Sequence, residues 1–243
     1  MLNEDLAYLA GVMRDGCVYV VDRHTYQTII IQKNTEWLEK VVEPIIRRQF
    51  GLIGKMRSCN GVGRLVYNSK YLAGWLISNF GCRPNVAWNT PGCINENSCE
   101  HALMKAYVRG FFDAEGCISF WKARIKGKEY LKQRLSITQY GNGKSCESLE
   151  KLRWLLRNFD IHMGIIHMMK DDPRKFRLQT SDRKNILRFW AEIAPKHPDK
   201  VLKFEQFLSR MRGKFELSAN PQGVPGLKQL EGRLRSSHPL NNA

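Results

Sequence analysis

The chain has 243 residues, of which 43% are hydrophobic and 26% are charged, a composition typical of globular proteins. It is long enough for one large domain or two compact halves. Its 39 Lys and Arg against 23 Asp and Glu give a formal net charge of +16. A surplus of that size favours a polyanionic partner over a merely basic, soluble protein, and nucleic acid fits better than an anionic membrane, because no segment forms a convincing basic amphipathic helix.

No apolar run is long enough to cross a membrane, and the beginning of the chain, Asn3-Glu4-Asp5, is unlike a signal peptide. Seven cysteines in no pairing pattern favour a reducing compartment over secretion. We therefore expect an intracellular protein, cytoplasmic or organellar.

The first part of the chain predicts the order helix, two strands, helix, two strands, helix. The predicted elements are a helix capped by Asn3 or Asp5 and ending near Met13, strands at 17–21 and 26–32, a helix from Asn34 or Thr35 to Phe50 with a kink at Pro44, strands at 55–59 and 64–67 around the turn Asn60-Gly61, and a helix from Ser69 to Phe80.

Residues 82–97, rich in Pro, Gly and Asn, are typical of a linker, and after it the same order repeats. The predicted elements are a helix from Ser98 to Asp113, strands at 117–125 and 130–139, a helix at 145–158, strands at 165–169 and 176–180, a helix from Ser181 to Ala194, and a further helix at 199–212 ended by Gly213. We expect a flexible tail at 214–243.

One unusual element occurs twice, which indicates a duplicated fold. The stretch Ala106 to Ile118 reads as an apolar helix that ends at Glu115 and Gly116 and runs into a strand, and a weaker copy, Ala7 to Val18, ends at Asp15 and Gly16. An acid at the C-terminus of a helix is unfavourable for the helix dipole, so finding it twice calls for a functional reason.

The segment Val108-Arg109-Gly110-Phe111-Phe112-Asp113-Ala114-Glu115-Gly116 resembles the second signature motif of the LAGLIDADG homing endonucleases in their single-chain, two-motif form. The resemblance covers most of residues 1–212. It implies an α+β fold of two pseudo-twofold-related αββαββα repeats, which form a saddle of antiparallel β-sheets backed by helices. The expected division is a first repeat at 1–81, the linker at 82–97, a second repeat at 98–213, and the tail.

The first motif departs from the family pattern. If Gly11 is aligned with Gly110, one residue is missing before Asp15; if the acids are aligned instead, Ala10 matches Gly110 and Arg14 stands opposite Ala114. A tighter last helical turn would absorb a missing residue. We expect Ala10, Gly11, Gly110 and Ala114 to form the interface between the two motif helices, because small residues allow helices to approach closely.

The resemblance also implies an active site. Asp15 and Glu115 would be catalytic metal ligands for Mg²⁺, with Mn²⁺ as a substitute, since hard cations prefer oxygen ligands. Asp113 matches a family position that serves helix-end structure. Gln32 and Gln139 match a glutamine that orients solvent, although ordinary polar strand ends are the alternative. Lys33 and Lys200 would lie near the phosphate or polarise water, and for Lys200 the alternative is a solvated helix end.

Alternating basic residues on the predicted strands suggest that one face of each sheet contacts DNA, with the other face packed on helices. The candidate DNA-binding residues are Arg23, Lys55, Arg57, Arg64, Lys122, Arg124, Lys126, Lys128, Lys132, Arg134, Ser136, Lys170, Arg174, Lys175 and Arg177. We expect Cys17 and Cys117 to pack in the core, and His162 and His167 to be structural, because no zinc-site spacing surrounds them.

The implied function is a monomeric, site-specific, divalent-metal-dependent double-strand DNA endonuclease that cuts a long asymmetric site to leave short 3′ overhangs. The chain begins with Met1 and does not end in His-Asn, which favours an intron-encoded homing enzyme over an intein. An intron-splicing maturase on the same fold, with intron RNA as partner, is the alternative, and a DNA-binding regulator is a third possibility. The paired acids favour the nuclease.

Overall fold

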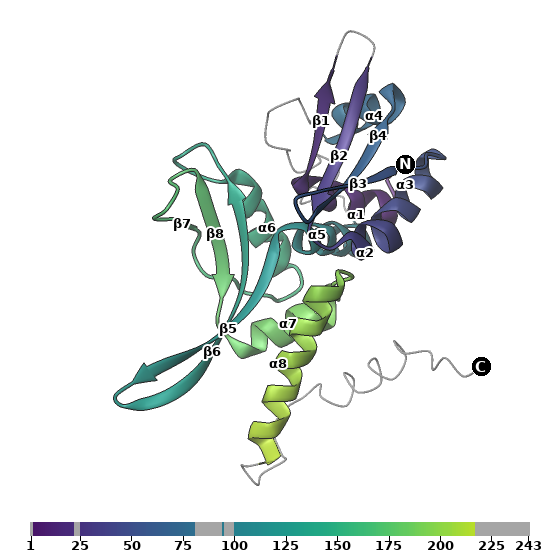
Figure 1. Cartoon of the computed structure of the whole chain (residues 1–243). Helices are drawn as coiled ribbons and strands as arrows, with labels where there is room; N and C mark the ends of the chain where they lie inside the picture. The colour runs from purple at the N-terminus through teal and green to yellow at the C-terminus, as the bar shows by residue number, and fades with distance from the viewer. Residues whose placement is uncertain (1, 22–24, 81–93, 95–99, 217–243) are drawn as a thin grey trace, which may run out of the picture. The chain divides into compact units, whose positions relative to one another are not determined.

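The computed structural model describes residues 2–21, 25–80, 94 and 100–216, without the side chains of Asp15 and of residues 212–216. The chain divides into one unit at 1–203 and a second at 204–243. The first unit contains two antiparallel four-stranded sheets, ordered β1-β2-β4-β3 and β5-β6-β8-β7, with helices packed against them (Figure 1). The expected α+β fold with a duplicated strand order is confirmed.

The first half contains α1 Glu4–Val12, the 3₁₀ turn η1 Met13–Asp15, β1 Gly16–Val20, β2 Tyr26–Gln32, α2 Thr35–Trp37, the π-helical turn η2 Leu38–Val42, α3 Glu43–Phe50, β3 Lys55–Cys59, β4 Val62–Asn68 and α4 Lys70–Phe80. The second half contains α5 His101–Glu115, β5 Gly116–Ile125, β6 Lys128–Tyr140, α6 Glu147–Arg157, β7 His167–Met168, β8 Lys175–Thr180, α7 Arg183–Ile193 and α8 Pro198–Glu216.

Most of the predicted turns and caps in the first half are confirmed. Asn60 and Gly61 both have positive φ, 52° and 72°, as a two-residue hairpin loop requires. Gly51 ends α3 in the left-handed conformation, and Ser69 caps α4 by accepting a hydrogen bond from the Leu72 amide. The helix was expected to be kinked at Pro44. The structure instead has the π-helical turn η2 directly before α3, in which Pro44 is one of the first residues. Proline cannot donate a backbone hydrogen bond, and the wider turn accommodates its absence.

Several boundaries in the second half differ from the sequence-based expectation. The helix expected to end at Asp113 continues to Glu115, and Glu100 is its N-cap rather than Ser98, which lies outside the described residues. Asp182, not Ser181, caps α7, because its carboxylate accepts the Asn185 amide. The last helix passes through Gly213 to Glu216. A single glycine is tolerated in a helix at a cost of about 1 kcal/mol.

Strand register shows the duplication more directly than sequence does. Gly16 pairs with Ile30 in the first sheet, and Gly116 pairs with Ile137 in the second. The glycine that follows each motif acid therefore has the same cross-strand neighbour in both halves, and Gln32 and Gln139 lie two residues beyond it.

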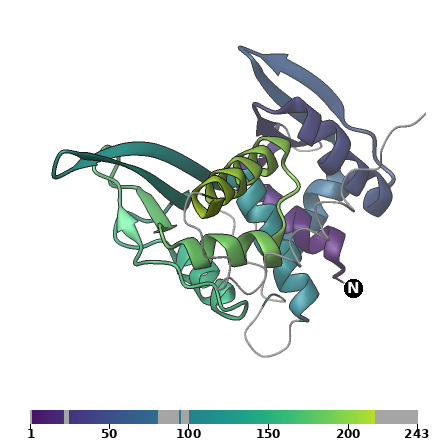
Figure 2. The same cartoon turned by 90° about the horizontal axis from the view of Figure 1, so that it is seen from below.

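The two halves differ in the length of their first hairpins. Pairing of β1 with β2 extends from Gly16 to Val20, whereas pairing of β5 with β6 extends from Gly116 to Ile125. Figures 1 and 2 show the far end of β5 and β6 as a two-stranded arm that extends beyond β8. Side chains on both faces of this arm near the turn are exposed.

The motif helices α1 and α5 pack against each other between the two sheets (Figures 1 and 2). Their closest approach is at Gly11 and Gly110, and the geometry is reciprocal. A Cβ on Gly11 would collide with the backbone of Tyr107 and Phe111, and a Cβ on Gly110 would collide with the carbonyl of Tyr8. The crossing therefore favours the alignment of Gly11 with Gly110. In that alignment the first motif has one residue fewer than the second between this glycine and the acid at the helix end.

The tight turn η1 compensates for the missing residue. Gly116 closes α5 with an α-type hydrogen bond to the Phe112 carbonyl, whereas Gly16 closes η1 with a 3₁₀-type bond to the Met13 carbonyl. Three residues of 3₁₀ helix rise about 6 Å, as much as four residues of α-helix. The predicted tighter turn is confirmed, and both helices can reach their strands after the same advance.

No helix within the described residues is long and apolar enough to cross a membrane. Of the expected linker, 82–93 and 95–97 lie outside the described residues, as does 217–243 of the expected tail. The division into repeats, linker and tail remains a prediction.

Gly110→Ala should destabilise the fold by about 3 kcal/mol, because the added methyl group meets backbone that cannot rotate away. The matched control is Gly74→Ala in α4, where an added Cβ meets nothing within 4 Å. That change should stabilise the chain by up to about 1 kcal/mol. Urea unfolding of both variants measures the difference, and equal effects at the two sites would contradict the close crossing.

Candidate active site and nucleic-acid interface

The best-defined part of the candidate active site is at the C-terminal end of α5. Glu115 is the last residue of that helix, and its Oε1 accepts a hydrogen bond of 2.9 Å from the Gln139 amide nitrogen. Gln139 is 9% exposed, on the helix-facing side of β6, in line with the buried Ile137. The second half therefore brings together two of the residues that sequence proposed for the site.

The first half contributes Gln32 to the same helix end. Its side-chain amide donates to the Ala114 carbonyl at 3.2 Å, while its Oε1 accepts the Lys33 amide. The side chain of Lys33 is exposed. The two equivalent glutamines thus both reach the end of α5, one at the carboxylate and one at the neighbouring backbone.

Asp15 is the last residue of η1, and its side chain lies outside the described part of the structure. Its backbone position follows from its neighbours. Gly16 is paired with Ile30 as Gly116 is paired with Ile137, so the backbone leaves both acids at equivalent points of the fold.

Lys200 lies in the first turn of α8 and is 8% exposed. Its ammonium donates to the carbonyls of Phe112 and Asp113, at 2.6 and 2.5 Å, in the last turn of α5. A cation there adds a second hydrogen bond to the Phe112 carbonyl, which already accepts the Gly116 amide, bonds the Asp113 carbonyl, and offsets the negative end of the dipole. The geometry therefore shows Lys200 holding the end of the helix that carries Glu115.

Asp113 is fully buried beneath the same helix end. Its Oδ2 accepts the Tyr8 hydroxyl at 2.8 Å and the Lys196 backbone amide at 2.9 Å, and the Trp37 indole donates to the Tyr8 oxygen at 3.0 Å. Burial raises the pKa of both Asp113 and Tyr8. This chain of contacts ties α1, α2 and α5 to the segment before α8, and sequence alone gave no sign of the Tyr8 and Trp37 contributions.

Arg14, the residue that the short first motif places awkwardly, also contacts α5. Its guanidinium donates to the Tyr107 hydroxyl at 2.9 Å and lies 4.9 Å from the centre of the Phe111 ring. A bulky side chain is accommodated because it extends along the aromatic residues of the partner helix.

Each sheet has one face packed on helices and one outer face. In the second sheet Leu135 and Ile137 are fully buried on the helix side, and the alternate residues of β6 point outward. Strand pairing brings seven basic residues to the outer faces: Lys55, Arg57, Arg64, Lys132, Arg134, Lys175 and Arg177. The paired strand residues that share these faces include no Asp or Glu.

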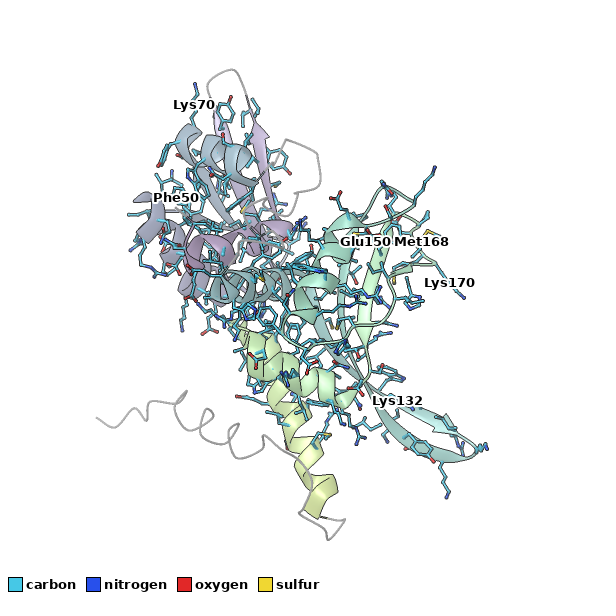
Figure 3. The ribbon with its side chains drawn as sticks, turned by 180° about the vertical axis from the view of Figure 1, so that it is seen from behind. Phe50, Lys70, Lys132, Glu150, Met168 and Lys170 are labelled. Carbon is cyan, nitrogen blue, oxygen red and sulfur yellow. The ribbon has the colours of Figure 1, made fainter. Side chains whose placement is uncertain are left out.

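Like charges meet directly on the first sheet, where Arg57 is paired with Arg64. Like charges opposite each other destabilise a sheet, and a bound polyanion would remove that cost. Figure 3 shows Lys132 on the arm and Lys170 beyond the end of β7. Lys170 and Arg174 are exposed in the loop between β7 and β8, with Arg174 bonded to Asp172.

Strand register corrects the placement of two residues on β5. Lys122 is paired with Leu131 and Arg124 with Glu129, so both lie on the face of the arm opposite to Lys132 and Arg134. Lys122 forms an ion pair with Glu129 at 3.2 Å. Lys126 and Lys128 are exposed at the turn of the arm.

Ser136 is only 6% exposed, so its surface offers little to a partner. Cys17 and Cys117 were expected in the core but lie on the outer faces, opposite Ile29 and Ser136. Successive residues of a strand point to opposite faces, and it is the next residue of each strand that points to the buried side. Arg23 lies outside the described residues.

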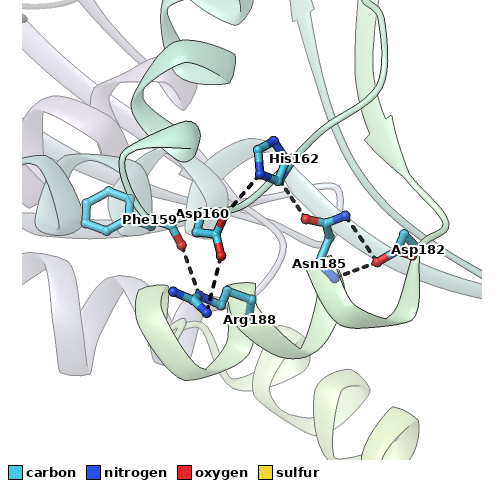
Figure 4. A network of polar contacts seen from close by, with 6 residues as sticks. All are labelled: Phe159, Asp160, His162, Asp182, Asn185 and Arg188. Atoms are coloured by element: carbon cyan, nitrogen blue, oxygen red, sulfur yellow. Dashed lines mark hydrogen bonds and ion pairs between the residues drawn. The ribbon is translucent and has the colours of Figure 1, made fainter.

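His162 and His167, which were expected to be structural, are both exposed, and the described residues contain no group of three or more His, Cys, Asp or Glu suited to a metal ion. His162 contacts Asp160 at 3.1 Å in an exposed network that joins the end of α6 to α7 (Figure 4). Within it, Asn185 accepts the His162 amide and Arg188 donates to the Phe159 carbonyl.

The residues at this end of α5 fit a magnesium ion. Mg²⁺ usually takes one or two carboxylates together with waters and substrate phosphates, so a three-residue cluster is not required. The Glu115 carboxylate supplies a hard oxygen donor, and its hydrogen bond to Gln139 fixes its orientation.

Comparison with known proteins shows what the chain is similar to in sequence and in fold. Residues 102–194, which include α5 and most of the second half, match the family model of the LAGLIDADG-like domain. The second half of the chain therefore resembles this family in sequence. A curated relative, the homing endonuclease I-ApeI of Aeropyrum pernix, is 27% identical over 227 residues, which cover 90% of this chain and 95% of the relative.

Another relative, a glutamine–fructose-6-phosphate aminotransferase of Methanocaldococcus jannaschii, is 26% identical over 176 residues, but these make up only 14% of its length. Among solved structures, I-DmoI in complex with DNA and Mn is 20% identical, with a TM-score of 0.56 and coverage of 80% of this chain and 98% of that one. I-SmaMI bound to uncleaved DNA is 14% identical, with a TM-score of 0.59 and coverage of 97% and 99%. These likenesses show that the LAGLIDADG fold extends over both halves.

His197, beside Lys200, provides a pH-dependent prediction. It is 3% exposed, 5.1 Å from the Trp37 ring, and its Nδ1 has no hydrogen-bond partner within the described structure. Burial lowers the pKa of His197 to about 4 from 6.5. The unfolded chain therefore binds a proton between these values that the folded chain does not, so stability falls as pH drops from 6.5 to 4.

His197→Phe should keep the packing on Trp37 and remove this loss, which amounts to at most about 3 kcal/mol at pH 4. Urea unfolding at pH 4.5 and 7.5 should give a smaller stability difference for the variant than for the parent chain. His162→Phe, at an exposed site, is the control and should leave the difference unchanged.

Proposed function

We propose that this protein is a site-specific DNA endonuclease of the homing type, which hydrolyses both strands of a long asymmetric duplex site and leaves short 3′ overhangs. The observation that carries the proposal is the combination of an acid held at the end of a crossing helix with two outer sheet faces that carry basic and no acidic residues. The I-ApeI relative, a named homing endonuclease, supports it.

The outer faces would bind the duplex. A twisted antiparallel β-ribbon fits the major groove, where Arg, Lys and Gln side chains can contact base edges, and phosphate contacts fix the register. Because both sheets and both motif helices belong to one chain, the protein would act on DNA as a monomer.

The residues around α5 would position the scissile phosphate and the attacking water. Gln139 orients the Glu115 carboxylate, and Gln32 and Lys200 hold the backbone of the last helical turn by hydrogen bonds to its carbonyls. Fixed polar groups lower the cost of reorganisation during the reaction. Lys33, exposed beside Gln32, would lie near a phosphate.

Glu115 and Asp15 would hold Mg²⁺, with Mn²⁺ as a substitute, and the ion would supply Lewis-acid stabilisation of the phosphate and a water of lowered pKa. The I-DmoI structures with Mn and Ca are consistent with a divalent cation at such a site. No observation on the described residues favours the RNA-binding maturase.

The direct test is cleavage of double-stranded DNA. A plasmid library with randomised inserts, incubated with the full chain and Mg²⁺, should yield a subset of molecules cut on both strands at one defined sequence, and EDTA should prevent the cut. Tight duplex binding with no cleavage in Mg²⁺ or Mn²⁺ would contradict a nuclease and leave a DNA-binding protein.

Glu115→Gln should lower the cleavage rate by at least about a thousandfold, because an amide cannot replace the negative charge that holds the metal. Binding measured in Ca²⁺ should change little. Glu150→Gln, an exposed glutamate on α6, is the control and should cut normally. Equal loss of binding and cleavage in the Glu115 variant would indicate a structural role instead.

Lys200→Met should destabilise the chain by about 1–3 kcal/mol, since it leaves the Asp113 carbonyl buried without its donor. Lys203→Met, one turn further along α8, is the control and should cost little, because its side chain is exposed. A stable Lys200→Met variant with unchanged cleavage would contradict a role for Lys200 at the helix end.

A further inference from the structure

The register of the two sheets allows each outer-face position of one half to be matched with its equivalent in the other. Ile30 and Ile137 are equivalent because each is paired with the glycine that follows a motif acid. Counting outward from this pair along the strands gives the matches Ile29 with Ser136, Ile31 with Thr138, Gln27 with Arg134, Tyr19 with Ser119, Val66 with Gln179, and Arg64 with Arg177.

The centres of the two faces differ in chemistry. In the first sheet the central residues are Ile29, Ile31 and Val66, none of which can form a side-chain hydrogen bond; Val66 is only 4% exposed, so Ile29 and Ile31 are the ones that present surface to a ligand. Their equivalents in the second sheet, named above, are two hydroxyl residues and one amide. Arg64 and Arg177, which are paired with Ile31 and Thr138, are the same residue type in both halves. A duplicated scaffold has therefore acquired an apolar central face in one half and a polar one in the other.

Unsatisfied polar atoms show the same contrast. Four outer-face atoms of the second sheet are buried without a hydrogen-bond partner: Ser119 Oγ, Arg134 Nε, Arg177 Nε and Gln179 Oε1. Among the described residues, no outer-face side-chain atom of the first sheet is buried without a hydrogen-bond partner. The hydroxyl groups of Thr28 and Tyr67 are, but these two residues face the helix side. Buried polar groups without partners are costly, and neighbouring side chains cover these four atoms, so a ligand would bond to them only after those side chains move.

The polar residues of the first sheet are partly occupied with each other. The Gln27 amide donates to Asn68 Oδ1 at 3.0 Å, at the end of the sheet remote from Gln32. Ile29 and Ile31 are half-buried and lie between this pair and Gln32. The apolar residues therefore occupy the part of the face nearest to the candidate active site.

We propose that the two halves read DNA by different chemistry: the first sheet selects thymine through its C5-methyl groups, and the second selects bases by hydrogen bonds, with Arg134, Arg177 and Gln179 as specificity residues. In the major groove the thymine methyl is the feature that an aliphatic side chain can recognise, whereas Arg pairs with guanine and Gln with adenine. The proposal rests on the proposed DNA-binding function of these faces.

The position of the residues predicts where in the site the thymines lie. Ile31 and Thr138 directly precede Gln32 and Gln139, which reach the end of α5. The base pairs facing Ile31 and Ile29 should be close to the cleavage positions. One half-site should therefore be thymine-rich near the cut, and the other should not.

The first measurement uses the full chain, Ca²⁺ and a pool of duplexes with a randomised segment, from which bound molecules are enriched and sequenced. Thymine is then replaced by deoxyuridine in synthetic copies of the selected site, a change that removes only the C5-methyl group. Each substitution in the inner part of one half-site should weaken binding about fourfold, the effect expected for one buried methyl, and substitutions in the other half-site should have a smaller effect, because Thr138 offers a single methyl group there.

The second measurement assigns the half-sites. The triple variant Ile29→Ser, Ile31→Thr and Val66→Gln gives the first sheet the residues of the second, and it should reduce the deoxyuridine sensitivity to the level of the other half-site and alter base preference in that half-site alone. Ile31→Ser alone, which removes the side-chain methyl groups at that position, is the milder variant should the triple variant unfold. Gln179→Val should change preference only in the opposite half-site.

The outcomes separate this inference from the proposed function. A selected duplex that is cut in Mg²⁺ but shows no methyl sensitivity, or equal sensitivity in both half-sites, overturns the inference and leaves the endonuclease intact. Unchanged preference in the folded Ile31→Ser variant overturns it too. If no duplex is enriched and none is cut, the proposed function fails and the inference fails with it.

Discussion

The approach of α1 and α5 at Gly11 and Gly110 is the constraint on which the rest of the structure depends. Each glycine lies against the backbone of the opposite helix, where a single methyl group would collide. Two helices so close together must end near one another, and each leads directly into the first strand of its own sheet. The crossing therefore sets the positions of both sheets and both motif acids together.

The polar contacts around this crossing act on the end of α5. A helix that ends in a glutamate is electrostatically unfavourable, because its last carbonyls already concentrate negative charge. Lys200 and Gln32 donate to those carbonyls, and Gln139 donates to the carboxylate itself. Donors from three separate segments thus stabilise an arrangement that the helix alone would not favour, as is common where a residue is held for chemistry.

The two halves combine a common framework with different surfaces. Register, hairpin turns and the glycines that follow the acids are the same in both, since these positions determine how the backbone pairs. The outer faces are less constrained, because solvent or a ligand, rather than the core, contacts them. Substitution there can change what each half binds without disturbing the crossing, and the contrast between the Ile29 and Ser136 positions is an example.

Much of this could be predicted from the sequence. Turn residues such as Asn60-Gly61, caps such as Ser69, and the repeated helix that ends in an acid and a glycine are determined by local backbone physics, so they identified the element order and the duplication. The sequence could not decide between two alignments of the first motif, because the packing of Gly11 on Gly110, which decides it, is a contact between residues far apart in the chain. Nor could it place Lys122, Arg124, Cys17 and Cys117 on the correct faces, since one step of strand register exchanges the two sides of a sheet. The local signals were sufficient for the fold, whereas the neighbours of Glu115 and the chemistry of each outer face depended on tertiary pairing.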